Sequence, residues 1–507
     1  MQKLYTKCLE IANIEKAIRT VFSHEGAKTA GVDGISKSSN ISQERIIKEV
    51  KLRLRRYKPV QSRKMQIPKG NGEYRELTII NLFDRIAQQA VYQIISPIVE
   101  EQMSKHSYGF RKGISAKVPV SKLATVLQRT KDTYTIELDF KKCFDNIPLD
   151  KAIGCIKEMG IKNFQLLRTI KHLMWTSREY SGVGLSQGTV LGPLLANCYL
   201  TKLDNFIEQN FELEKSDNHY KRDYASHKDE WIKWHLERGK KIYCKYYRYA
   251  DDTFITCKNE AEQKYIAEVI SEFVKTKLEI ELNQDKSHFR HNEIHFLGFK
   301  LIKNKQSIWI LIDNLKNYTE ELKKFKLNTY SQCNQFMKWL RGVLNYFDIV
   351  NDMENLLEKI KWRLYCRSKT GIVQRISTTY QFGKGRSKTI IDIYALRKYT
   401  KTSYKEYLFD NRWLKCREML KVKDTEEQRS GAYQYLWSLW TKQRGKDAIT
   451  KEALNPFDIR LHHIKPVAKG GTNSPENLIL VSSKTHYLIH YGKDLDRRFE
   501  KYRKHLK

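Results

Sequence analysis

The stretch KYYRYADDTFIT (residues 245–256) decides how the central part of the chain folds. Two runs of β-branched and aromatic residues surround Asp251 and Asp252, and this pattern predicts a β-hairpin with both carboxylates at its turn. An Asp-Asp pair is also ordinary in a hairpin turn, so the pair alone identifies no function.

A second stretch, TYTIELDFKKCF (133–144), predicts a strand that ends near Asp139. If this strand pairs with the hairpin, three carboxylates lie side by side, and like charges that close need divalent cations to coexist. Two Mg²⁺ ions would suit in-line attack of a primer hydroxyl on a nucleotide phosphate, because they stabilise both the attacking and the leaving oxygen.

The composition indicates a partner with many negative charges. The chain has 507 residues, with 93 Lys and Arg against 58 Asp and Glu, which gives a formal net charge of +35. A surface this basic favours nucleic acid, because each phosphate contact releases a counterion. The nine cysteines stand singly, which predicts neither a disulfide framework nor a zinc ribbon. The long uncharged window at 180–201 is broken by Gly, Pro and polar residues, and the N-terminus lacks a secretory pattern. We therefore expect an intracellular protein without a membrane span.

The rest of the chain alternates between strand and helix patterns. Residues 63–80 predict a hairpin around Asn71-Gly72, and residues 294–302 predict a further strand pair. Helical spacing occupies the chain up to about residue 56, with an interruption at 31–40, and returns at 84–99 and at about 312–366.

The motifs resemble, in order, those of the reverse transcriptases encoded by group II introns, whose palm carries a Tyr-Ala-Asp-Asp turn like residues 249–252. The matching stretches are VDGIS (32–36), IPKGNGEYREL (67–77), DRIAQQAV (84–91), SYGFRKG (107–113), LDFKKCFDNI (138–147), GLSQGTVLGPLLANCYL (184–200), YRYADD (247–252), LNQDKS (282–287) and FLGF (296–299). The resemblance implies an α/β multidomain protein, a right-hand polymerase with fingers, a palm built on an antiparallel sheet, and an α-helical thumb or maturase domain.

The resemblance implies roles for the metal site and the nucleotide sugar. Asp139 and Asp251 would bridge the two Mg²⁺ ions, with Asp252 secondary, and the carbonyl oxygen of Phe140 would reach the ion on the nucleotide side. Phe144 would lie under the sugar and exclude a 2′-OH, which favours deoxynucleotides and disfavours an RNA-dependent RNA polymerase.

Further residues are assigned to nucleotide binding or proton transfer by the same resemblance. Lys69 and Arg75 would clamp the triphosphate, although both are equally typical of exposed turn residues. Gln187 and Tyr249 would contact the nucleotide or template. Lys286 would donate a proton to the leaving pyrophosphate, although a lone surface lysine is the alternative.

The stretch LHHIKPVAKGGTNSPENLILVSSKTHYLIH (461–490) resembles the ββα-metal fold of HNH nucleases. His486 and His490 share one helix face and would hold a divalent cation together with His462. His463 would activate water and Asn477 would orient it. Any one of these histidines alone is more often structural.

The cysteines that bind a structural zinc in this family are missing. Asp447 and Thr450 occupy two of the cysteine positions, and Thr485 precedes His486. We therefore expect no structural zinc and a module that depends on its apolar core.

The resemblance divides the chain into an N-terminal extension and fingers (1–115), a palm (116–305), an α-helical thumb or maturase domain (306–400), a DNA-binding linker (401–430) and an HNH domain (431–507). It implies an RNA-directed DNA polymerase of a mobile group II intron, with maturase and target-strand nicking activities. The expected partners are intron RNA as template and ribozyme, target DNA and deoxynucleoside triphosphates, in the cytoplasm or nucleoid of a bacterium; an organelle and a homodimer stay open. The alternatives are a defence-associated or domesticated reverse transcriptase, or a splicing maturase with little polymerase activity.

Overall fold

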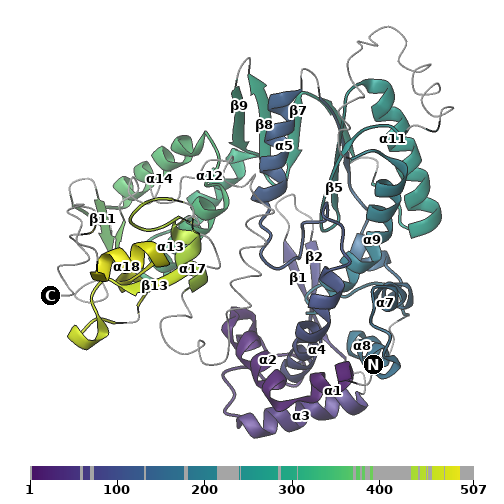
Figure 1. Cartoon of the computed structure of the whole chain (residues 1–507), viewed down its shortest axis with the longest axis horizontal. Helices are drawn as coiled ribbons and strands as arrows, with labels where there is room; N and C mark the ends of the chain where they lie inside the picture. The colour runs from purple at the N-terminus through teal and green to yellow at the C-terminus, as the bar shows by residue number, and fades with distance from the viewer. Residues whose placement is uncertain are drawn as a thin grey trace. The chain divides into compact units, whose positions relative to one another are not determined.

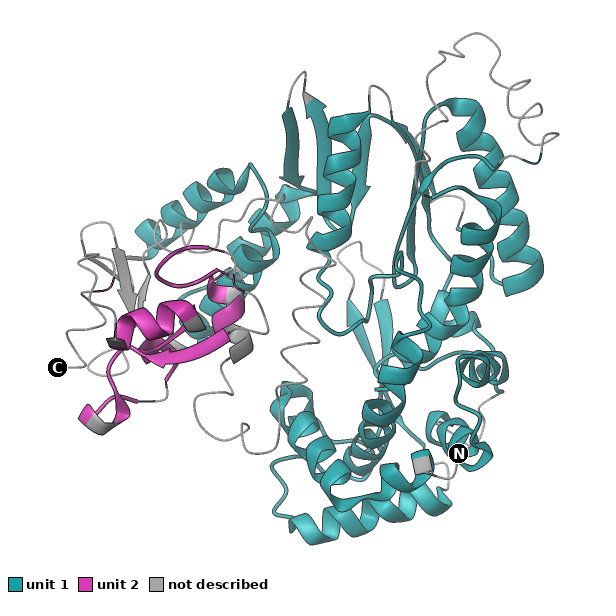
Figure 2. Ribbon diagram, viewed as in Figure 1, with its two compact units in different colours: residues 1–407 teal, residues 408–507 magenta. Residues whose placement is uncertain are grey.

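The computed structural model describes residues 3–57, 61–68, 74–130, 133–175, 181–213, 239, 241–283, 287–304, 307–368, 373–376, 379–382, 389–391, 436–443, 446–452, 454, 459–472, 474–491 and 499. The chain divides into two compact units, residues 1–407 and 408–507 (Figure 2). The predicted DNA-binding linker at 401–430 lies outside the described residues. Across the described ranges, no helix is both long and apolar enough to cross a membrane.

The first unit opens with helices packed around one central helix, α4 (Leu82–Glu100), drawn in purple and blue in Figure 1. The buried Gln88 of α4 donates a hydrogen bond to the carbonyl oxygen of Leu173 and accepts one from the amide of Val190. This amide therefore ties α4 to two segments that follow much later in the chain. The elements before α4 are α1 (Lys3–Leu9), α2 (Ile11–Ser23), η1 (Glu25–Lys28), α3 (Gln43–Arg56), β1 (Arg63–Pro68) and β2 (Tyr74–Ile79). β1 and β2 pair antiparallel, which confirms the predicted hairpin strands; the Asn-Gly turn lies outside the described residues.

A four-stranded antiparallel sheet in the order β4-β5-β3-β6 forms the centre of the unit. Its strands are β3 (Tyr134–Leu138), β4 (Lys245–Tyr249), β5 (Asp252–Cys257) and β6 (His288–His291). The hairpin predicted from 245–256 and the strand predicted to end near Asp139 are confirmed, and they pair with each other. Every residue of β5 after Asp252 is buried, as expected of a strand that has a neighbour on each side and helices over it.

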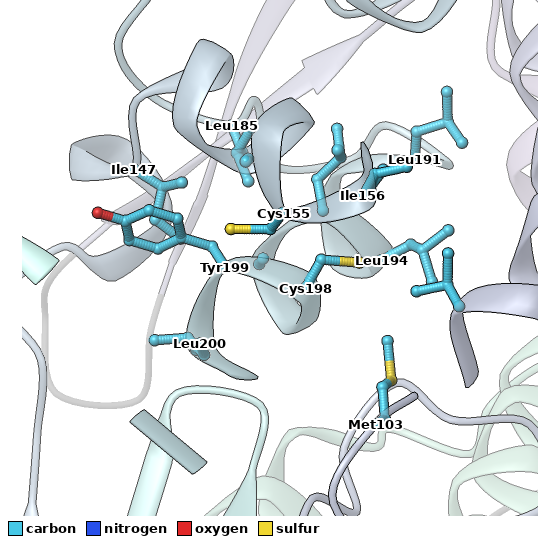
Figure 3. Close-up of a cluster of buried hydrophobic side chains, with 14 of the residues drawn as sticks. Met103, Ile147, Cys155, Ile156, Leu185, Leu191, Leu194, Cys198, Tyr199 and Leu200 are labelled. Carbon is cyan, nitrogen blue, oxygen red and sulfur yellow. The ribbon is translucent and has the colours of Figure 1, made fainter. Parts of the chain in front are cut away.

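Helices cover this sheet and build the core beside it. α11 (Glu260–Phe273) packs on β3 and β5, and α9 (Gly192–Asn210) packs on α7 (Leu149–Glu158). Figure 3 shows the cluster of buried side chains there, in which the hydroxyl of Tyr199 donates to the carbonyl oxygen of Leu278. The remaining elements of this part are α5 (Lys117–Arg129), α6 (Cys143–Asn146), α8 (Phe164–Met174) and the π-turn η2 (Val274–Leu278).

A second sheet and three helices follow the central sheet. β7 (Glu293–Phe296), β8 (Phe299–Asn304) and β9 (Ser307–Ile312) form an antiparallel sheet against which α5 packs. The helices predicted for about 312–366 are confirmed as α12 (Leu315–Lys324), α13 (Tyr330–Tyr346) and α14 (Met353–Ser368). A capping box between Thr329 and Gln332 sets the start of α13.

Strands also occur inside the region 306–400, for which the sequence predicted helices only. β9 alternates buried and exposed residues and extends the predicted β7–β8 pair, which the neighbouring helical pattern concealed. Three short strands, β10 (Gln374–Ile376), β11 (Thr379–Phe382) and β12 (Thr389–Ile391), form a small antiparallel sheet. Strands of three or four residues carry too few positions to show a period.

The second unit contains two antiparallel strands followed by a helix. β13 (Ile459–His463) pairs with β14 (Leu478–Ser482), and α18 (Ser483–Tyr491) packs on both strands. The other described elements are α17 (Leu436–Gln443), η8 (Val467–Lys469) and η9 (Pro475–Asn477). Leu439, Trp440, Leu478 and Leu480 are among the residues of its apolar core.

Candidate active site

The three predicted aspartates lie at one end of the central sheet. Tyr249 of β4 pairs with Asp252 of β5, so that Ala250 and Asp251 form the turn between the strands. Asp139 follows directly after β3, whose last residue, Leu138, pairs with the residue after Asp252. Antiparallel pairing therefore brings Asp139 to the end of the sheet that carries the hairpin turn.

The aspartates act on one another electrostatically. Burial raises the pKa of Asp251, with a further contribution from Asp139, while Arg75 opposes the rise. Desolvation and the charges of Asp251 and Asp139 together raise the pKa of Asp252 to about 7. Negative charges that raise the pKa of neighbouring carboxylates also favour a cation between them.

A buried arginine holds the turn from the protein interior. Arg248 is fully buried, and its guanidinium donates to both carboxylate oxygens of Asp204, at 2.7 and 2.6 Å. Its other N–H groups donate to the side chains of Asn197 and Ser107 and to the carbonyl oxygen of Ala250. Burial alone would lower the pKa of Arg248, but the Asp204 carboxylate outweighs burial and the pKa is raised. The ion pair therefore stays charged and fully hydrogen-bonded.

The segment Ser107–Gly109 packs directly against the same turn. The amide of Tyr108 donates to the carbonyl oxygen of Arg248 at 2.7 Å, and the side-chain amide of Asn197 donates to the carbonyl oxygen of Gly109 at 2.7 Å. A Cβ on Gly109 would lie 2.1 Å from the backbone nitrogen of Ala250. Only glycine fits this close approach. Ala250 itself has a left-handed backbone, with φ of 60°, which the surrounding hydrogen bonds maintain.

Phe140 and Phe144 follow Asp139 on the loop and short helix after β3. Phe140 is buried, and in the described part of the chain its carbonyl oxygen accepts no hydrogen bond. Phe144 is half-buried, and its carbonyl oxygen accepts from the amide of Leu185. Its ring contacts that of Phe110 edge-to-face, with centroids 5.9 Å apart.

The hairpin of β1 and β2 acts on the aspartates electrostatically through Arg75. Arg75 is exposed on β2, and its positive charge lowers the pKa of both Asp251 and Asp252. The turn that carries Gln187 joins the same hairpin, since the amide of Thr78 donates to the carbonyl oxygen of Gln187 at 2.7 Å. Predicted site residues Lys69 and Lys286 lie outside the described residues.

Three predicted histidines converge in the second unit. The ring centroids of His462 lie 5.3 Å from His486 and 5.2 Å from His490, and the ligand atoms of the three rings lie within 4.8 Å of one another. His462 is buried, and its Nε2 has no hydrogen-bond partner among the residues that the structure describes. Burial, together with the charges of the neighbouring histidines, lowers the pKa of His462 to about 4. A neutral, buried imidazole without a partner has the protonation state that a metal ion requires.

His463 and Asn477 lie beside this cluster with different surroundings. His463 is half-buried and pairs across the hairpin with Leu478. The Asn477 side chain accepts from the amide of Lys465 at 2.8 Å and donates to the carbonyl oxygens of Lys465 and Thr472. Asn477 therefore fixes the loop that follows His463, and any effect on the orientation of His463 acts through that loop.

Asp447 occupies one of the positions at which a zinc-binding cysteine is missing. Its carboxylate forms a set of hydrogen bonds, named here the carboxylate brace, that connects two segments of the second unit. Asp447 is buried, and one carboxylate oxygen accepts from the amides of Ile449 and Thr450 while the other accepts from the amide of Ser482. Thr485 is also buried and bonds the hydroxyl of Ser482. These bonds join the turn at 447–450 to the end of β14 without a metal.

The central antiparallel sheet thus carries three aspartates at one end, and Arg75 of the β1–β2 hairpin acts electrostatically on two of them. The family model described as "Reverse transcriptase (RNA-dependent DNA polymerase)" matches residues 67–301. The chain belongs to this reverse transcriptase family and is an RNA-directed DNA polymerase of the group II intron type. The predicted α/β right-hand fold is thereby confirmed.

Two relatives match different shares of this chain and of their own length. The chain is 30% identical over 320 residues to Protein YkfC of Escherichia coli (strain K12), across 58% of this chain and 81% of that protein. It is 28% identical over 329 residues to Group II intron-encoded protein LtrA of Lactococcus lactis subsp. cremoris, across 56% of this chain and 54% of that protein. The match thus spans about half the length of LtrA. A structure of telomerase from Candida albicans aligns with a TM-score of 0.35 at 10% identity, across 70% of this chain and 68% of that one, which is too slight to support an inference.

The sequence did not reveal the residues that support the turn. Arg248, Ser107, Gly109 and Asn197 all lie inside motifs that resemble the family, but their residue types alone assign them no task. A charged residue three positions before a predicted metal ligand, within a run of strand formers, is the one available signal.

Proposed function

We propose that this protein copies the RNA of a mobile group II intron into DNA, with Asp139 and Asp251 as the shared metal ligands and Asp252 as a secondary one. The observation that carries the proposal is the YADD turn, which lies beside the end of β3 and is held there by Arg248. Bound Mg²⁺ would supply charge stabilisation for the attacking and leaving oxygens. The raised pKa values of Asp251 and Asp252, to which the charge of Asp139 contributes, support this assignment, because a bound cation would relieve the repulsion between the carboxylates.

The neighbouring residues would bind the nucleotide. The carbonyl oxygen of Phe140 is available as an additional ligand, since no described group bonds it. Arg75, whose charge reaches both aspartates, would bind the triphosphate with paired donors, and Lys69 would assist it. Phe144 would exclude a 2′-OH. Gln187 and Tyr249 would contact the nucleotide or template, and Lys286 would protonate the leaving pyrophosphate.

RNA-templated synthesis by the full chain tests this proposal. The purified protein should extend a DNA primer on an RNA template with deoxynucleotides and Mg²⁺, and EDTA should abolish extension. Digestion of the template with ribonuclease before the reaction is the control. Failure of the wild type to extend any primer on RNA would favour the vestigial maturase alternative.

We also propose that the second unit nicks target DNA, because the converging histidines include a buried ring nitrogen that no described residue bonds. His462, His486 and His490 would hold one divalent cation, and His463 would take a proton from the attacking water. A nick supplies the 3′-OH that polymerisation needs, so the two sites would act in sequence.

The His463→Ala variant tests this assignment. It should lose nicking of target DNA while it extends a supplied primer at the wild-type rate, because His463 would act only on the nuclease's water. His172→Ala is the control, since His172 lies in α8 of the first unit, and it should retain both activities. Unchanged nicking by His463→Ala would refute the role of His463.

A further inference from the structure

Phe110 combines three features that an ordinary surface phenylalanine does not share. Its side chain is 47% exposed, its backbone is left-handed with φ of 55°, and its ring meets Phe144 edge-to-face at an interplanar angle of 89°. A left-handed backbone is uncommon for a bulky residue and persists only where the surroundings enforce it. The enforcing contacts lie in the three residues before Phe110.

The segment before Phe110 is bonded to the turn that carries Asp251. Tyr108 donates its amide to the carbonyl oxygen of Arg248, and the carbonyl oxygen of Gly109 accepts from Asn197. Gly109 lies so close to Ala250 that no side chain fits between them. The backbone that delivers the Phe110 ring is therefore positioned by the same groups that position the aspartate.

The left-handed backbone at Phe110 brings its ring into contact with the ring of Phe144. Phe144 packs against the main apolar core and is half-buried, and the Phe110 ring is a second contact, edge-to-face, outside that core. Phe110 belongs to neither of the large buried clusters of the first unit, so its ring adds little to the core. An edge-to-face partner restricts the tilt of the Phe144 ring.

We propose that Phe110 is a positioning residue that braces Phe144 and thereby sets the selectivity of the polymerase for deoxynucleotides. This inference rests on the proposed role of Phe144 as the residue that excludes a 2′-OH. A ring held at one tilt collides with an added hydroxyl, whereas a ring that can tilt away admits it.

The test is the ratio of kcat/KM for a ribonucleotide to kcat/KM for the matching deoxynucleotide, measured by single-nucleotide extension with the full chain. Phe110→Ala should raise this ratio on the order of tenfold, and Phe144→Ala on the order of a hundredfold. Phe110→Tyr should keep the wild-type ratio, because it retains the ring. Phe164→Ala removes another exposed phenylalanine, on α8, and should leave the ratio unchanged.

A double variant separates bracing from an independent contact. In the Phe144→Ala background, Phe110→Ala should raise the ratio no further, because the ring that Phe110 supports is already gone. An unchanged ratio in Phe110→Ala, or an equal rise in both backgrounds, would overturn the proposal. Phe110→Gly is the second variant if Phe110→Ala does not fold, since glycine removes the ring and suits the left-handed backbone.

The outcomes distinguish this inference from the proposed function. If the wild type makes no DNA on an RNA template, the proposed function fails. If it makes DNA and Phe144→Ala admits ribonucleotides while Phe110→Ala does not, only the bracing role of Phe110 fails.

Discussion

The guanidinium of Arg248 donates a hydrogen bond to the carbonyl oxygen of Ala250 at 2.8 Å, so a buried side chain holds the residue directly before Asp251. The same guanidinium is anchored by Asp204, which is fully buried as well. A buried ion pair contributes little net stability compared with apolar residues of similar size, and its value here lies in the fixed direction of its donors. Because both of its partners are buried in the core, the ion pair holds the turn that carries the aspartates in a fixed position.

Arg248→Lys should reduce catalysis much more than nucleotide binding. A lysine keeps the positive charge beside Asp204. It lacks the planar set of N–H donors with which the guanidinium also reaches the carbonyl oxygen of Ala250. We expect kcat for primer extension to fall by roughly a hundredfold while KM for the deoxynucleotide changes little, because a small displacement of a metal ligand misaligns the reaction. Arg290→Lys is the matched control, since Arg290 pairs with Glu137 in the same sheet but does not contact the turn. If KM for the deoxynucleotide changed by as large a factor as kcat in Arg248→Lys, the result would argue against a positioning role for Arg248.

Asp447→Ala should loosen the second unit without an effect on polymerisation. The change leaves three amides without their shared acceptor, which should lower the free energy of unfolding of this unit by about 3 kcal/mol. Hydrogen exchange of the full chain measures it at the amides of Ile449, Thr450 and Ser482. Asp447→Asn retains one acceptor oxygen and should show a smaller effect. Exchange at the wild-type rate in Asp447→Ala, or a stoichiometric zinc that resists chelation, would contradict the carboxylate brace.

Acid should destabilise the first unit through His106. Burial lowers the pKa of His106 to about 4, with help from Lys105 and Lys122, while the carbonyl oxygen of Tyr246 and the carboxylate of Asp204 oppose the shift. The ordinary value is 6.5, so between these two values the unfolded chain binds a proton that the folded chain does not. Stability should therefore fall as the pH drops through this window, by at most about 1.4 kcal/mol per pH unit.

Urea unfolding at several pH values checks the role of His106. The wild type should lose more stability than His106→Gln between the ordinary and the lowered pKa, and the two should respond alike above that window. Equal losses throughout would show that other groups dominate acid unfolding.

Residue type and spacing predicted the aspartates and histidines that the structure brings together at the two candidate sites. The aspartates interrupt strand formers, and His486 and His490 recur at helical spacing, so pattern alone places each set on its element. Other residues hold these groups in place through tertiary contacts. Such contacts cannot be predicted from the spacing of residues in the sequence. Arg248 meets Asp204, Asn197 and Ser107, which come from separate segments of the chain.

The same limit applies to backbone conformation and to the second unit. The left-handed backbone at Phe110 follows from the close approach of Gly109 to Ala250, a contact between distant residues. The sequence marks Asp447 as a replaced cysteine, but the three amides that it caps become visible only when β14 lies beside the turn. Short strands such as β10 to β12 were missed because their pairing, and not their pattern, defines them.

The most direct test of the central claim is primer extension on an RNA template by Asp251→Asn, an isosteric change that removes the charge of one proposed shared metal ligand. We predict that kcat falls by on the order of a thousandfold or more, because the site binds the catalytic ions less tightly. Asp150→Asn, at an exposed carboxylate paired with Lys171, should extend at the wild-type rate. Extension by Asp251→Asn at a rate close to that of the wild type would contradict the assignment of the polymerase site to this turn.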